Sequence, residues 1–179
     1  ASKLRIAIGG TSGKSTVTGM TGWILDQAGL DPTIMNVAVM KNYVRPDTPF
    51  ASARVGAGDG FVSEVDESDG SIALYQPDVA VLNNVALDHK SMDELRRLFG
   101  DFARRAGRAI VNADNAEALA LAGSNATTFG FGENADLRGT DLVERPDGVD
   151  FLAGGVRVCL NVPGRHNASN ALAALATAE

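Results

Sequence analysis

Residues 9–16 combine glycines, hydroxyls and a lysine at the spacing of a phosphate-binding loop. They follow the mostly apolar run of residues 4–8. A strand that turns through glycines into a helix aims backbone N–H groups and the positive end of the helix dipole at one anion. Lys14 would supply a cation for the β- and γ-phosphates, and Ser15 a hydroxyl for Mg²⁺. The expected phosphate-binding residues are Gly10, Thr11, Ser12, Gly13, Lys14, Ser15 and Thr16.

Two better-known glycine patterns fail at the same position. The first glycine of the full Walker motif, and that of the dinucleotide fingerprint, would both fall on Ile8. The alternative is a glycine-rich turn with a chance lysine. We favour the phosphate loop because strand, turn, lysine, hydroxyl and helix all agree.

An acidic segment, residues 64–70, follows a second expected strand. Mg²⁺ prefers oxygen ligands and keeps some of its waters. Glu64 is the metal candidate because it is nearest the strand end, where the metal of a bound nucleotide would lie. For Asp66, Glu67 and Asp69, a solvated acidic turn explains the sequence equally well.

Two further polar clusters contain both histidines of the chain. Residues 83–89 follow the buried run 79–82 and end in His89, a candidate metal ligand or acid–base group. If Glu64 and His89 both serve Mg²⁺, we expect the strands before them to be neighbours with both carboxyl ends at the loop. Asn167 and Asn170 lie three apart at a helix start, where they would cap the helix or contact a purine edge.

Strand and helix patterns alternate along the chain and predict an α/β fold. We expect a P-loop-type, mainly parallel sheet flanked by helices. A small antiparallel hairpin region is expected near residues 135–160, where Pro-Asp-Gly and Gly-Gly turns split short runs. The expected strands are residues 4–8, 33–35, 60–64, 79–82, 108–111 and 127–129. One helix is expected to begin at Ser15, and three others are expected at residues 92–106, 115–122 and 167–179.

Local signals add detail to two of these helices. Ser91 and Glu94 form a capping-box signature before the helix of residues 92–106. In the helix that begins at Ser15, apolar residues fall on one face, with Trp23 beside it and Gly29 as a stop. The residues of that face are Val17, Met20, Ile24 and Ala28.

Composition limits the classes of protein and partner. A chain of 179 residues with 45% hydrophobic content suits one α/β domain. The formal net charge is −6, so there is no basic surface for nucleic acid or anionic membrane. No apolar run reaches the length of a membrane span. The single cysteine, Cys159, fits a reducing compartment, and we expect a cytoplasmic location.

Four motifs together resemble the Mur ligases, which form amide bonds with ATP during the synthesis of peptidoglycan precursors. The resemblance covers residues 1–179 and only the central ATP-binding domain of that family. It implies that an N-terminal UDP-binding domain and a C-terminal domain, absent from this chain, are partners in the same polypeptide. The branch that adds L-alanine to UDP-N-acetylmuramate, and the branch that reattaches recycled tripeptide, look most similar. The motifs lie at residues 10–16, 64–71, 84–89 and 164–171.

The resemblance also implies a role for each candidate residue, with ATP and Mg²⁺ as cofactors. The phosphate loop and Lys14 would hold the triphosphate. Ser15 and Glu64 would bind one Mg²⁺, and His89 would help to hold a second. Asn167 and Asn170 would contact adenine. The acceptor would be a UDP-sugar or another carboxylate, converted to an acyl phosphate that an amine then attacks. Lys14, Glu64 and His89 are the expected catalytic residues.

Three alternatives stay open. The first is a P-loop kinase or other NTPase, in which Glu64 or Asp78 would replace the acidic residue of the Walker-B strand. The second is a nucleotide-binding module that has lost catalysis. The third is a related ligase that acts on a non-peptidoglycan acceptor, as in the folate-polyglutamate and cyanophycin types.

Overall fold

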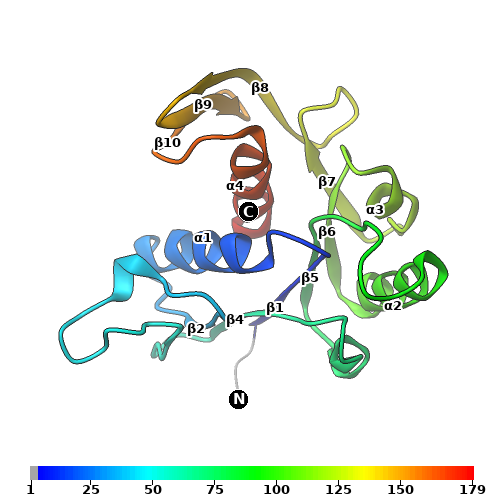
Figure 1. Cartoon of the computed structure of the whole chain (residues 1–179), viewed down its shortest axis with the longest axis horizontal. Coiled ribbons are helices and arrows are strands. Elements are labelled where there is room, and N and C mark those ends of the chain that lie inside the picture. Colours follow the sequence, from blue (N-terminus) through cyan, green and yellow to red (C-terminus); the bar gives the residue numbers. More distant parts are fainter. Residues whose placement is uncertain (1–3) are drawn as a thin grey trace.

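The computed structural model describes residues 4–179, which build one ten-stranded sheet flanked by helices (Figure 1). The strand order is β10-β9-β8-β7-β6-β5-β1-β4-β2-β3. The strands from β8 to β2 pair in parallel, and the pairs at both edges are antiparallel. The strands are β1 (Leu4–Gly9), β2 (Thr33–Met35), β3 (Ala53–Arg54), β4 (Gly60–Glu64), β5 (Val79–Leu82), β6 (Arg108–Asn112), β7 (Ala126–Gly130), β8 (Leu137–Arg145), β9 (Gly148–Ala153) and β10 (Val156–Leu160).

Helices cover both faces of the parallel part. On one face, α1 and α4 pack against each other and against the central strands. On the other face, α2 packs on β5, β6 and the short helix η2, and α3 packs on β6. The helices are α1 (Lys14–Gln27), η1 (Lys41–Tyr43), η2 (Ser71–Leu74), α2 (Met92–Arg105), α3 (Ala116–Ala120) and α4 (Arg165–Ala178).

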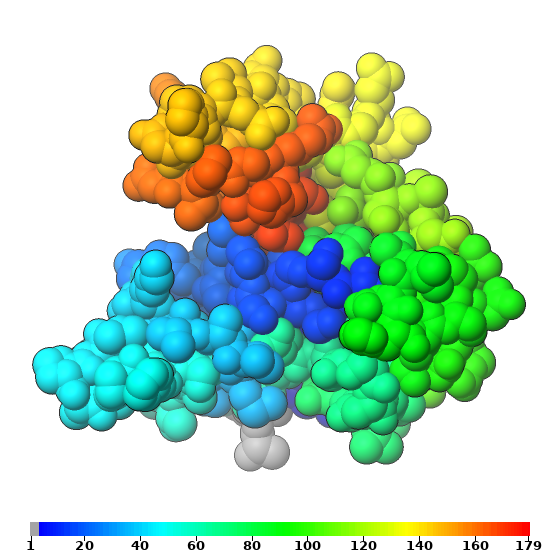
Figure 2. Space-filling model, in the orientation of Figure 1, coloured from blue at the N-terminus to red at the C-terminus, as the bar shows by residue number. Residues whose placement is uncertain are grey.

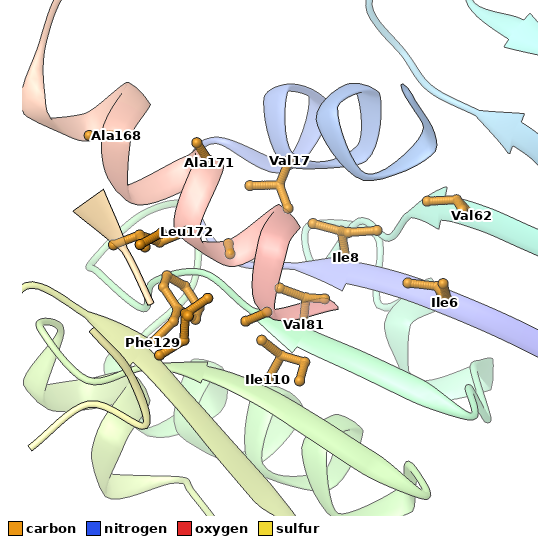
Figure 3. Close-up of a cluster of buried hydrophobic side chains, with 14 of the residues drawn as sticks. Ile6, Ile8, Val17, Val62, Val81, Ile110, Phe129, Ala168, Ala171 and Leu172 are labelled. Carbon is orange, nitrogen blue, oxygen red and sulfur yellow. The ribbon is translucent and has the colours of Figure 1, made fainter. Parts of the chain in front are cut away.

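Alternating side chains of the central strands supply the two cores. Ile6 and Ile8 of β1 point toward α1 and α4, whereas Ala7 points to the α2 face. The same alternation places Val81 with the first core and Leu82 with the second. Figure 3 shows the first core, with its strand residues facing helix residues across the layer. Its labelled residues are Ile6, Ile8, Val17, Val62, Val81, Ile110, Phe129, Ala168, Ala171 and Leu172.

The buried face of α1 differs from the apolar face that the sequence pattern indicates. Val17 is fully buried, but Ile24 is only partly covered and Ala28 is exposed. The helix lies against α4 and the sheet through small residues, because bulky side chains would hold it too far away. At Gly22, for example, an added Cβ would lie 2.4 Å from Cδ1 of Ile34. The buried face of α1 is Val17, Thr18, Thr21, Gly22 and Leu25.

The other element predictions agree with the structure to within a few residues. Ser91 caps α2, because its side chain accepts a hydrogen bond from the Glu94 amide at 3.3 Å. The predicted hairpin region is the meander of β8, β9 and β10. Within residues 4–179, no helix is long and apolar enough to cross a membrane.

Candidate nucleotide-binding site

The phosphate loop lies at the carboxyl end of β1, at the centre of the sheet, and leads directly into α1. Gly10 and Gly13 have φ angles of 137° and 80°, which favour glycine. A side chain at Gly13 would also collide, since an added Cβ would lie 2.6 Å from Nδ2 of Asn83 and 2.7 Å from Oδ1 of Asn170. Gly13 precedes the first turn of α1, where backbone N–H groups lack intrahelical partners and can bind an anion.

Asn84, just beyond β5, holds the loop in shape. Its Oδ1 accepts hydrogen bonds from the Thr11 hydroxyl at 2.7 Å and from the Ser12 amide at 2.9 Å. The Ser12 hydroxyl is a weaker third donor at 3.3 Å. The Nδ2 of Asn84 donates to the Ser12 carbonyl at 2.9 Å. One amide side chain therefore fixes two consecutive loop residues from a neighbouring strand.

Lys14 carries the positive charge of the site. Its Nζ donates to the carbonyl of Gly10 at 2.8 Å and forms an ion pair with Oε2 of Glu67 at 2.9 Å. The Lys14 side chain is 19% exposed, and that of Glu67 is 6% exposed. Lys14 is thus folded back over the loop, and Glu67 points inward from the acidic segment.

Ser15 and Glu64 are in direct contact. The Ser15 hydroxyl donates to Oε2 of Glu64 at 2.9 Å, and Oε1 of Glu64 accepts from the amide of Val37. Asn36 adds a hydrogen bond from its Nδ2 to the Ser15 carbonyl at 3.0 Å. Within residues 4–179 no group of three His, Cys, Asp or Glu side chains could hold a metal. A hydroxyl and a carboxylate fit Mg²⁺ that takes its remaining oxygens from phosphate and water.

His89 follows β5 and lies on the surface. Its side chain is 82% exposed, with Nε2 3.4 Å from a carboxylate oxygen of Asp88. Hydrogen bonds from Ser68 are the main cause of a lowered pKa of the Asp66 carboxyl, and the charges of Lys14 and His89 lower it further. Burial of the carboxyl acts in the opposite direction and raises this pKa. Within residues 4–179, no hydrogen bond or ion pair joins His89 to Lys14, Ser15 or Glu64.

The prediction that the strands before Glu64 and His89 are neighbours is wrong. Glu64 ends β4 and His89 follows β5, and β1 pairs with both of them, so it separates the two. Both carboxyl ends still flank the loop, because the loop itself leaves β1. Asp78 cannot serve as a Walker-B residue, since it precedes β5 at the opposite end and pairs with Arg5 at 3.0 Å.

The two asparagines of α4 differ in their surroundings. Asn170 is buried, and its Oδ1 accepts from Nδ2 of Asn83 at 3.0 Å. That same Nδ2 donates to the Ser12 carbonyl, which links α4 to the phosphate loop. Asn167 is half-buried, and its Nδ2 donates to the carbonyl of Pro163 at 2.8 Å. Neither side chain accepts a hydrogen bond from the first-turn amides of α4 as a cap would.

A groove of about 480 Å³ lies beside the first turns of α1. Ser15, Thr16 and Asn36 line the end next to the loop, and Met20 and Trp23 provide an apolar wall. In Figure 2, the blue part of the surface is formed by the start of the chain. It is surrounded by three segments: the orange residues that lead into α4, the cyan segment after β2 and the green segment after β5. Ser12 and Thr16 of the loop are exposed to solvent.

Two residues of the site were not singled out by the sequence. Glu67 is buried against Lys14, but nothing in the acidic segment distinguishes it from Asp66 or Asp69. Asn36 directly follows β2, and the rule that ligands bind at the carboxyl ends of parallel strands could have identified it.

Comparisons with known proteins identify the family and the fold of the chain. The family model of the Mur ligase middle domain matches residues 8–178. The structure of UDP-N-acetylmuramate-alanine ligase from Thermotoga maritima is similar, with a TM-score of 0.82 and 25% identity over 97% of this chain and 40% of that chain. The structure of UDP-N-acetylmuramate:L-alanyl-gamma-D-glutamyl-meso-diaminopimelate ligase from Neisseria meningitides is also similar. Its TM-score is 0.79, with 27% identity over 98% of this chain and 60% of that chain.

A MurF structure from Acinetobacter baumannii matches with a TM-score of 0.71 and 25% identity over 98% of this chain and 42% of that chain. The chain thus spans between 40% and 60% of the length of these three proteins. The match to the family covers nearly all of residues 4–179, including the phosphate loop and the clusters after β4 and β5. The chain therefore belongs to the Mur ligase family and forms its middle domain.

Proposed function

We propose that this chain is the ATP-binding domain of a ligase that forms amide bonds through an acyl phosphate. The observation that carries the proposal is the position of Lys14 and Ser15 at the start of α1, directly after the loop that leaves β1, with the Ser15 hydroxyl 2.9 Å from Glu64 at the end of the neighbouring strand β4. The loop amides and Lys14 would bind the triphosphate. Ser15 and Glu64 would hold Mg²⁺, which supplies positive charge against the phosphate oxygens.

The remaining candidate residues have supporting roles in this proposal. His89 would lie near the γ-phosphate and the acceptor carboxylate, where an exposed imidazole can still move onto a ligand. Asn167 and Asn170 would contact adenine, at the helix that Asn83 ties to the phosphate loop. A bound ATP would then lie across the loop, with its base toward α4 and its γ-phosphate toward Glu64.

The reaction that fits this site starts with attack of an acceptor carboxylate on the γ-phosphorus. The acyl phosphate and ADP form, an amine then attacks the acyl carbon, and phosphate leaves with its bonding electron pair. We propose a UDP-N-acetylmuramate-type acceptor and an amino acid or peptide as the amine. The similarity to the UDP-N-acetylmuramate ligases of Thermotoga maritima and Neisseria meningitides supports this assignment. A cytoplasmic location belongs to the same proposal.

The test is an amide-synthesis assay on this chain and on the polypeptide that contains it together with the flanking domains of the family. We expect residues 1–179 to bind nucleotide with little or no synthesis, because the acceptor must be held in line with the γ-phosphate. The longer polypeptide should form product with L-alanine or with the tripeptide. Product with neither would move the function to a ligase with a different acceptor. Fast synthesis by residues 1–179 alone would refute the need for further domains.

A further inference from the structure

Glu67 is the only charged side chain among the buried polar residues of the described range, 4–179. The residue is 4% exposed. The turn around it is anchored, because Val65 and Ile72 on either side are in the α2 core. The amide of Gly70 also donates to the Glu67 carbonyl at 3.2 Å. The carboxylate is therefore held under the phosphate loop and is not part of a solvated acidic turn.

The contact with Lys14 accounts for this burial. A buried carboxylate needs a partner, and Nζ of Lys14 lies 2.9 Å away. An ammonium group has three N–H donors. Glu67 and the carbonyl of Gly10 each take one of them. The third N–H is then left for a ligand at the loop, in an orientation that the other two fix.

Several carboxylates surround the one lysine of the loop. Lys14 contributes one positive charge, and Glu64, Asp66 and Glu67 contribute three negative ones in the same region. These carboxylates oppose the attraction that Lys14, the loop amides and the helix dipole exert on a bare triphosphate. A nucleotide that carries a divalent cation has a smaller net negative charge, so the carboxylates repel it less. The cation itself would be attracted to the carboxylates.

We propose that Glu67 is a positioning residue for Lys14 that also makes nucleotide binding dependent on the divalent cation. It holds the ammonium over the loop before the ligand arrives, and its charge offsets that of Lys14. The inference rests on the proposed nucleotide function of this site. Glu67→Gln would keep a hydrogen-bond acceptor for Lys14 and remove the charge, whereas Glu67→Ala would remove both.

The experiment is calorimetric titration of the wild type and the variants with ATP in EDTA and with ATP plus excess Mg²⁺. For Glu67→Gln we expect tighter binding, by about tenfold for free ATP and about threefold for the magnesium complex, because the repulsion scales with the charge of the ligand. Glu67→Ala should bind both forms more weakly than Glu67→Gln, because Lys14 is no longer held. Asp69→Asn is the matched control: Asp69 lies on the same turn but is exposed, and both affinities should stay at the wild-type values.

The outcomes separate the two proposals. If the wild type binds the magnesium complex but Glu67→Gln matches it in both titrations, the inference about Glu67 is overturned and the nucleotide site stands. The inference about Glu67 is also overturned if Glu67→Gln and Glu67→Ala weaken nucleotide binding equally, because that result would indicate a purely structural role for Glu67. If the wild type binds neither form, the proposed function fails and the inference about Glu67 fails with it.

Discussion

Asn84→Ala tests whether the phosphate loop depends on a neighbouring strand for its shape. The substitution removes four side-chain hydrogen bonds to Thr11 and Ser12, three of them between 2.7 and 2.9 Å. The backbone bond from the Thr11 amide to the Asn84 carbonyl, at 3.1 Å, remains. The loop should therefore stay attached to β5 but lose the contacts that fix its conformation.

The expected size of the effect follows from these contacts. A hydrogen bond contributes about 1 kcal/mol net, and the loop is partly exposed, so water replaces some of what is lost. We expect the free energy of unfolding to fall by about 1–2 kcal/mol. Nucleotide affinity should fall by about tenfold, because the loop must be ordered again when the phosphates bind.

Urea denaturation and calorimetric titration with ADP and Mg²⁺ measure the two quantities. The control is Asn125→Ala, which also removes side-chain hydrogen bonds, from Nδ2 to the carbonyls of Ala103 and Ala106, but does so away from the site. That variant should lose stability and keep wild-type affinity. If Asn84→Ala loses stability but binds nucleotide as the wild type does, the loop holds its own shape and the reasoning is wrong.

Three further substitutions test the stability of the fold. Phe129 is fully buried between α4 and the sheet, so Phe129→Ala should lower the free energy of unfolding by about 3–5 kcal/mol in urea denaturation. Phe50→Ala, at an 80% exposed residue, should change it by less than about 0.5 kcal/mol. Hydrogen bonding to Arg145, followed by Cys159 and Arg157, lowers the pKa of Asp150 from 3.8 to about 2. Because the folded state lowers the pKa of Asp150, the ionised carboxylate stabilises the fold at pH values above its ordinary pKa, and this contribution is lost as the pH falls through about 2. Asp150→Asn should thus be less stable than the wild type at pH 6, and the difference in the free energy of unfolding should shrink as the pH falls from about 4 toward 2.

The fold was predictable because its signals are local and repeated. Buried apolar runs predicted the strands, Ser91 predicted the start of a helix, and glycines predicted the turns. The alternation of strands and helices then predicted a mainly parallel sheet. The order of strands was not predictable from these signals, since β1 inserts between β4 and β5 through long-range pairing. The buried face of α1 was missed because close packing favoured Thr18, Thr21 and Gly22 over larger apolar residues.

The site was predictable where a motif carries its own geometry. The phosphate loop, with Lys14 and Ser15, is such a motif, and Glu64 could be chosen because it ends a strand. Glu67 could not, because burial of one carboxylate among several depends on how the turn packs on the core. The exposure of His89 likewise depends on the path of the chain after β5, for which the sequence has no local signal.

The central claim is that the loop ahead of α1 binds the phosphates of ATP through Lys14. Calorimetric titration of the wild type and Lys14→Ala with Mg²⁺ and ATP tests it most directly. We expect the wild type to bind and Lys14→Ala to bind at least about tenfold more weakly, because the variant lacks the cation that faces the β- and γ-phosphates. Equal affinity in the two proteins, or no binding to the wild type, would contradict it.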